Sequence, residues 1–143
     1  MKKSVIILIA VIYVASIALV SFFGLKFKTY DEKVYVEKIE ITNTDGIKYK
    51  DDGSKYVVIR PDANGELKYK IEYVVTPDNA TEAIPSFRYD PSITYVSIDE
   101  ETGVVTFDKS KMPSRGVGAV EITLVPKDGS DTSDKIEIRA FAN

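Results

Sequence analysis

Residues 4–25, SVIILIAVIYVASIALVSFFGL, form an uncharged and mostly apolar run that determines how the rest of the chain is organised. Lys2 and Lys3 precede the run, and Lys26 and Lys28 follow it. At about 1.5 Å per residue, a helix of this length extends roughly 33 Å, which is enough to cross a hydrocarbon core of about 30 Å. The run therefore predicts a transmembrane helix that contacts membrane lipid through residues 4–25, with the remaining chain as a tethered domain.

A cleaved signal peptide, which would release a secreted form, is the alternative interpretation of this run. Ser16 and Ala18 have the small-residue spacing that signal peptidases prefer. The length favours a signal anchor, because the apolar region of a signal peptide has about 7 to 15 residues and cleavage after Ala18 would leave an apolar new N-terminus. Lipid attachment to cysteine is excluded, since the sequence contains no cysteine.

The short basic segment before the run predicts the orientation in the membrane. A short, positively charged N-terminus normally stays in the cytoplasm while the following domain is exported. We therefore expect a single-pass protein of the cell membrane with residues 1–25 as cytoplasmic tail and anchor. Residues 26–33 form a juxtamembrane linker, and residues 34–143 form an extracytoplasmic domain. Eight linker residues span at most about 28 Å, so this domain is held close to the bilayer.

Charge and composition exclude several classes of function for the tethered part. Since Lys2 and Lys3 are the two basic residues before Lys26, the remaining chain has 17 basic and 22 acidic residues, a net charge of −5. Nucleic acids and anionic lipid surfaces both favour a basic face, so neither is an expected partner. Cysteine and histidine are absent, which excludes thiolate and imidazole metal sites and serine–histidine–aspartate triads. We expect no enzyme activity and no cofactor.

From Val34 onward, apolar and polar residues alternate in short runs. The clearest run is residues 67–75, LKYKIEYVV, which is predicted as one strand with one apolar and one largely charged face. The phase of an earlier run changes near Glu37 and Lys38, which predicts either a bulge or a strand that crosses between sheets. Other runs, separated by Gly, Pro and Asp turns, are centred on Tyr56–Ile59, Phe87, Val96, Ile98, Val105, Phe107, Val120, Ile122, Leu124, Ile136, Ile138 and Ala140. The pattern predicts an all-β domain, a sandwich of about seven to eight antiparallel strands.

Four pieces of the domain resemble the bacterial immunoglobulin-like group 2 (BIG2) family in their order and spacing. They are VTPDNAT at residues 75–81, Phe87 where the family often has tryptophan, VSID at 96–99 with TGVVT at 102–106, and GAVEIT at 118–123. The resemblance covers Val34 to Ala142 and departs from the family in the loops 61–66 and 113–116.

This resemblance implies an immunoglobulin-like sandwich and a non-catalytic surface module of the kind repeated in bacterial adhesins and cell-surface enzymes. We therefore expect a membrane-anchored bacterial surface protein that presents the module for interaction with a protein or a glycan of the cell envelope. The short linker favours a partner in the same envelope over a distant host cell.

Two acidic loops are candidate metal sites. The candidates are Asp99, Glu100 and Glu101 in one turn and Asp128, Asp131 and Asp134 at every third residue of another loop. Calcium binds several carboxylate oxygens, so such clusters can hold it. Neither loop has the EF-hand spacing, however, and aspartate in a turn is also explained by hydrogen bonds to the local backbone. Two interpretations stay open: structural turns, or a calcium-dependent carbohydrate-binding module or envelope enzyme that uses the acidic loops.

Overall fold

The computed structural model describes residues 2–24, 32–113 and 115–143. The chain divides into two compact units, Met1–Glu32 and Lys33–Asn143. Residues 26–31 of the predicted linker, including Lys26 and Lys28, lie outside the described residues.

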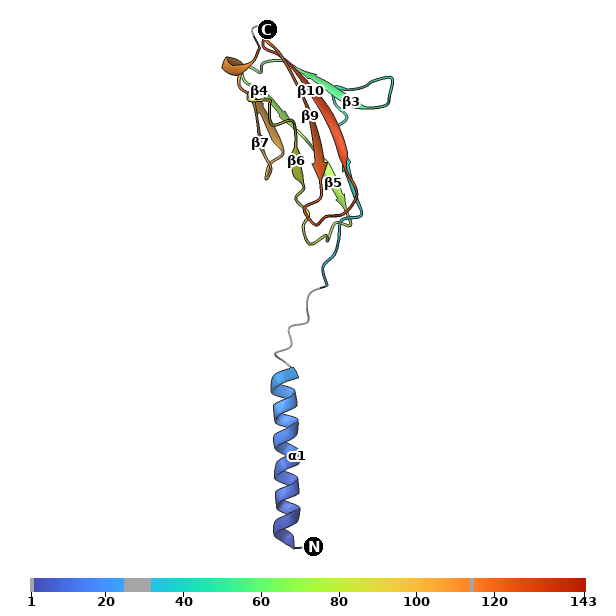
Figure 1. Cartoon of the computed structure of the whole chain (residues 1–143), viewed down its shortest axis with the longest axis vertical. Helices are drawn as coiled ribbons and strands as arrows, with labels where there is room; N and C mark the ends of the chain where they lie inside the picture. The colour runs from blue at the N-terminus through green and yellow to red at the C-terminus, as the bar shows by residue number, and fades with distance from the viewer. Residues whose placement is uncertain (1, 25–31, 114) are drawn as a thin grey trace. The chain divides into compact units, whose positions relative to one another are not determined.

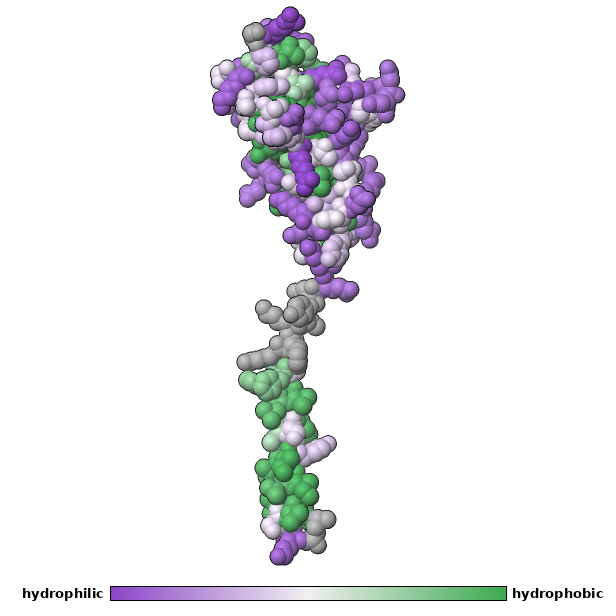
Figure 2. Space-filling view, in the orientation of Figure 1, coloured by the Kyte–Doolittle hydropathy of each residue, from purple (hydrophilic) through white to green (hydrophobic). Residues whose placement is uncertain are grey.

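The first unit contains the helix α1 (Lys3–Gly24), which has 22 residues, none of them buried. Its surface is apolar along most of its length (Figure 2). The hydroxyl of Ser16 donates a hydrogen bond to the carbonyl oxygen of Ile12 at 2.8 Å. This polar group is therefore satisfied within the helix, as a segment surrounded by hydrocarbon requires.

The second unit consists of strands joined by turns (Figure 1). Its described residues form β1 (Lys38–Ile41), β2 (Ile47–Tyr49), β3 (Lys55–Ile59), β4 (Leu67–Lys70), β5 (Tyr73–Thr76), β6 (Ser86–Arg88), β7 (Val96–Asp99), β8 (Val104–Phe107), a 3₁₀ turn η1 (Lys109–Lys111), β9 (Val117–Val125) and β10 (Asp134–Phe141). Hydrogen bonds group these strands into three sheets, with the orders β1-β5, β2-β3-β10-β9-β6 and β4-β8-β7.

All three sheets contribute to one hydrophobic core. The long neighbouring strands β9 and β10 (Figure 1) provide its centre, because every second residue of each is buried. Across from them lie Ile39 and Ile41 of β1, Leu67 of β4 and Val105 and Phe107 of β8, all buried in the same cluster. A shared core between packed sheets is consistent with a β-sandwich. The predicted all-β class and the inward phase of these strands are confirmed.

The change of phase predicted near residue 37 is also present. Val36, Ile39 and Ile41 are all buried, although Ile39 is three positions after Val36 and regular alternation would place these two on opposite faces. Strand β1 begins only at Lys38, and the N–H of Glu37 donates to the carbonyl oxygen of Thr76 at 2.7 Å.

The alternating run 67–75 is divided between two strands, so its prediction as one strand is wrong. Strand β4 pairs with β8, whereas β5 pairs with β1. Between them, the N–H of Ile71 donates to the carbonyl oxygen of Gly103 at 2.9 Å, and the N–H of Glu72 donates to the side chain of Asn43 at 2.7 Å. The chain changes partners here while keeping its inward phase, since Leu67 and Ile71 are both buried.

Two further features differ from the predicted antiparallel arrangement. Strand β3 runs parallel to β10, with Val57 opposite Ile138, although the other strand pairs are antiparallel within the described residues. The described chain also has ten strands, more than the seven to eight predicted. The division of the 67–75 run adds one strand. The three-residue strand β2, which has no buried residue, adds another.

Candidate functional site

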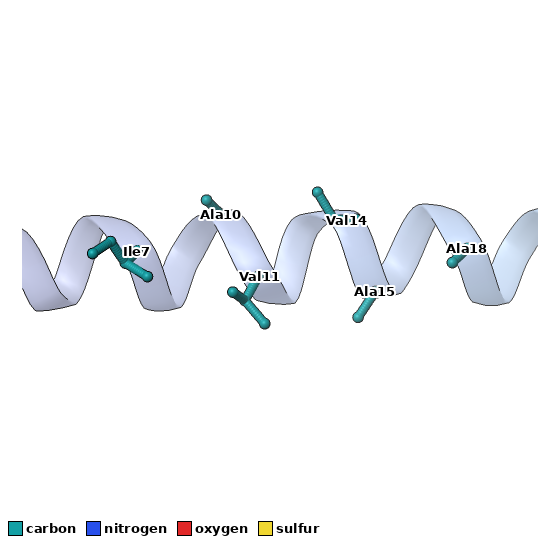
Figure 3. A pocket seen from close by; sticks show the side chains of 6 residues that line it. All are labelled: Ile7, Ala10, Val11, Val14, Ala15 and Ala18. Carbon is teal, nitrogen blue, oxygen red and sulfur yellow. The ribbon is translucent and has the colours of Figure 1, made fainter.

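The helix α1 is the predicted membrane contact, and its composition fits that role. Within the described residues it is the one helix long and apolar enough to span a membrane. A shallow groove runs along one of its faces, where alanines lie between branched side chains (Figure 3). The groove is lined by Ile7, Ala10, Val11, Val14, Ala15 and Ala18. It offers only apolar contacts, which suit acyl chains.

Asp128, a predicted calcium ligand, lies in the turn between β9 and β10 and binds backbone groups. Its Oδ2 accepts a hydrogen bond from the N–H of Val36 at 2.7 Å, and its Oδ1 accepts one from the N–H of Ser130 at 2.9 Å. Bonds from Ser130 and from the Val36 N–H lower the pKa of the Asp128 carboxyl. The side chain thereby ties the segment before β1 to the turn.

Asp134, the first residue of β10, makes a similar contact further along the same segment. Its Oδ2 accepts hydrogen bonds from the N–H of Ile41 at 2.8 Å and from the ammonium of Lys55 at 2.9 Å. Burial alone raises the pKa of Asp134, but the bonds from Ile41 and Lys55 outweigh it and leave the pKa below its ordinary value. Asp128 and Asp134 together form a clamp on residues 36–41, which we call the aspartate clamp.

The other acidic loop lies between β7 and β8 and also binds its surroundings. Asp99 accepts a hydrogen bond from the N–H of Glu101 at 3.0 Å. Glu100 accepts one from the N–H of Phe87, on strand β6, at 3.3 Å and one from the ammonium of Lys127 at 2.9 Å. The bond from Lys127, with that from Phe87, lowers the pKa of Glu100. The edge strand β6 is therefore held by a carboxylate, as β1 is.

The predicted metal candidates are thus distributed among separate structural contacts. Two candidates remain, and both are exposed: Glu101 between β7 and β8, and Asp131 in the turn between β9 and β10. Among residues 2–24, 32–113 and 115–143, no group of three or more acidic side chains is placed so that it could hold a metal ion. Calcium binding by these loops stays a prediction.

A charged network covers part of the outer face of β10. The carboxylate of Glu137 pairs with the ammonium of Lys50 and with the guanidinium of Arg139. The guanidinium of Arg139 also lies 4.5 Å from the centre of the Tyr56 ring. Hydrogen bonds from Lys50 and Arg139 lower the pKa of Glu137. All four side chains are already engaged with one another.

A polar depression of about 450 Å³ lies beside this network, between β9 and the end of β6. It is lined by Arg88, Tyr89, Asp90, Ile93, Glu121 and Thr123. Arg88 and Thr123 are directly opposite in the β6–β9 pairing. We call this site the β6–β9 depression.

No motif of the sequence indicates this depression, although its lining includes both basic and acidic residues. In the sequence, Arg88 is a single polar residue between Phe87 and Tyr89. Glu121, more than 30 positions later, joins it in the depression only because β6 pairs with β9. No signal of local spacing could have identified the depression.

No protein-family model and no characterised protein matches the sequence.

Proposed function

We propose that the chain is a single-pass membrane protein that presents a non-catalytic β-sandwich for binding a protein or glycan partner of the cell envelope. The observation that carries the proposal is the combination of a 22-residue apolar helix, none of it buried, with a separate unit of strands around its own core. The apolar residues of α1 are exposed in the part of the chain that the structure describes, and a bilayer supplies the apolar environment that such a helix needs.

We further propose that the strand unit is an immunoglobulin-like module of the BIG2 type. The strand order supports this assignment. In an immunoglobulin sandwich, one sheet has the order A-B-E-D and the other G-F-C. Here β1-β5 and β4-β8-β7 would supply the first order, with β4 and β5 as two halves of strand B, and β10-β9-β6 the second.

Two of the BIG2-like pieces have roles in the core that support the same assignment. Phe87, at the position of the family's tryptophan, is buried, and its ring contacts that of Tyr73 edge to face with 5.9 Å between centroids. Gly103, in the TGVVT piece, accepts the hydrogen bond from Ile71 where β4 ends. The resembling residues therefore occupy positions on which the packing depends.

The partner is best sought with the anchor in place, because the short linker restricts where the domain can reach. Cross-linking in intact cells, followed by purification of the full chain from membranes, should recover a specific envelope protein or glycan. A variant with a disrupted core, Ile71→Asp, should lose the partner while keeping the helix. Recovery of no partner, or equal recovery with the unfolded variant, would contradict the binding role.

The proposed orientation has its own test. Protease added to intact cells stripped of their wall should remove the domain after Lys33, since the domain is proposed to lie outside the membrane. Protection in intact cells with digestion only after lysis would place the domain in the cytoplasm and overturn the topology.

A further inference from the structure

We infer that the β6–β9 depression binds a neutral saccharide through vicinal hydroxyl groups. This inference rests on the proposed function, because it names a ligand class and a site for the same binding module. It starts from Arg88, whose guanidinium has no ion-pair or hydrogen-bond partner among the side chains and backbone that the structure describes. Arg139 of the neighbouring network is instead paired with Glu137 and stacked on Tyr56, so of these two guanidinium groups only that of Arg88 is available to a ligand.

The depression combines hydrogen-bond donors with acceptors. The guanidinium of Arg88 offers several N–H donors in a planar fork, and the carboxylates of Asp90 and Glu121 offer acceptors. The hydroxyl of Thr123, opposite Arg88, can do both. Vicinal hydroxyls of a sugar need this mixture, since each hydroxyl both donates and accepts.

The charge of the site favours a neutral ligand. The site contains one positive charge, on Arg88, and two negative charges, on Asp90 and Glu121. The ammonium of Lys135 lies 3.6 Å from the carboxylate of Glu121 and compensates its charge. The local charge is therefore close to zero. A phosphate or sulfate would meet the repulsion of Asp90, and a cationic peptide would meet Arg88.

The inner side of the depression is apolar and held in place. The hydroxyl of Tyr89 donates to the carbonyl oxygen of Val96 at 3.2 Å, and Tyr89 and Ile93 pack against the hydrophobic core. The turn between them is fixed, since Asp90 accepts from the N–H of Ser92 at 2.9 Å and its carbonyl oxygen accepts from the N–H of Ile93 at 3.1 Å. The depression is open to solvent and mostly polar, and its volume of about 450 Å³ lies within the range of about 300–1,000 Å³ of small-ligand sites.

The test measures binding of the full chain, reconstituted in lipid nanodiscs, to an array of neutral oligosaccharides built from glucose, galactose, mannose and N-acetylglucosamine. Sulfated and uronic-acid oligosaccharides and lysine-rich peptides on the same surface serve as competing ligand classes. We expect saturable binding to at least one neutral oligosaccharide. Arg88→Ala and Glu121→Gln should each weaken it about tenfold or more, because each removes a charged hydrogen-bonding group.

Arg60→Ala is the matched control, because Arg60 is another exposed arginine, placed after β3 and away from the depression. Its binding should equal that of the parent, and all three variants should keep the parent's melting temperature. Absence of neutral-saccharide binding, equal binding by Arg88→Ala, or a preference for the anionic sugars or the peptides would overturn the inference. If the envelope partner is still recovered by cross-linking in these cases, the proposed binding role stands and only the saccharide site is wrong.

Discussion

Ile71 is the residue at which the domain changes sheets, and its side chain is 1% exposed. Truncation to alanine would leave a cavity between sheets that cannot close without moving β4 and β5. We expect Ile71→Ala to lower the free energy of unfolding by about 2 to 5 kcal/mol. The neighbouring exposed Lys70 is the control, and Lys70→Ala should change the free energy of unfolding by less than about 0.5 kcal/mol. Urea unfolding of the full chain in nanodiscs, followed by tyrosine fluorescence, measures both, and equal effects would show that the inward phase is wrong.

Gly103 has a backbone φ of +72°, and an added Cβ would lie 2.7 Å from the carbonyl oxygen of Ile71. Gly53 has a similar φ of +81°, but nothing lies within 4 Å of the position of its Cβ. We expect Gly53→Ala to cost about 1 to 2 kcal/mol, the penalty of the left-handed conformation. Gly103→Ala should cost clearly more, because the rigid backbone oxygen must also move. Thermal unfolding of the two variants separates the cost of the left-handed backbone conformation from the cost of the steric clash. Equal losses of stability in the two variants would contradict the close contact at Gly103.

At the scale of elements, the aspartate clamp holds the segment leading into β1. The pKa of Asp134 is lowered in the folded state, so its stabilising contribution is present above the pKa of the unfolded chain and is lost as pH falls through the folded pKa. We expect Asp134→Asn to lower the free energy of unfolding at neutral pH by about 1.5 to 3 kcal/mol, the range for a hydrogen bond to a charged group. This difference from the parent should shrink as the pH falls below the ordinary aspartate range.

Asp131→Asn is the matched control, since Asp131 is an exposed aspartate in the same turn region. Its urea unfolding curves should follow the parent at every pH. A difference between parent and Asp134→Asn that stays constant from neutral to acidic pH would show that the carboxylate charge does not act through the clamp. The same variants address calcium: a rise in melting temperature on adding the metal that Asp131→Asn abolishes would favour a metal site over structural turns.

The strands that the sequence predicted well are those with a buried and an exposed face. Val120, Ile122 and Leu124 of β9 alternate with polar residues because the other face meets solvent, and the same holds for β10. The parallel pairing of β3 with β10 could not be predicted, because alternation shows which face is buried but not which strand is the neighbour. The break after Lys70 was hidden for a similar reason, since Leu67 and Ile71 keep one phase while the hydrogen-bond partners change.

The candidate sites show the same limit. Asp128, Asp134 and Glu100 were visible as acidic residues, but not their bonds to other elements. The two aspartates bind Val36 and Ile41, 92 and 93 positions away, and Glu100 binds Phe87, 13 positions away. Composition indicates that oxygen ligands are available, whereas the fold decides which donors reach them. The β6–β9 depression is the opposite case, because ordinary surface residues become a candidate site only through the pairing of two distant strands.

At the scale of the whole molecule, the helix α1 is proposed to act as an anchor and the strand unit to bind the partner. The small residues Ala15, Ala18, Ser21 and Gly24 recur at every third position, which drifts around the helix, and the run contains no GxxxG motif. Close helix association in membranes favours small residues four apart, so strong self-association of α1 is not expected.

We therefore expect a chain in which residues 4–25 are replaced by an unrelated apolar span of equal length to keep its membrane location and its cross-linked partner. The comparison uses the same partner-recovery assay, with protease accessibility in wall-stripped cells to verify export and the melting temperature to verify folding. If partner recovery disappears while the domain remains exported and folded, the interaction belongs to the membrane segment. That result would assign binding to the apolar face of the helix and remove it from the sandwich, because the substitution changes no residue after Leu25.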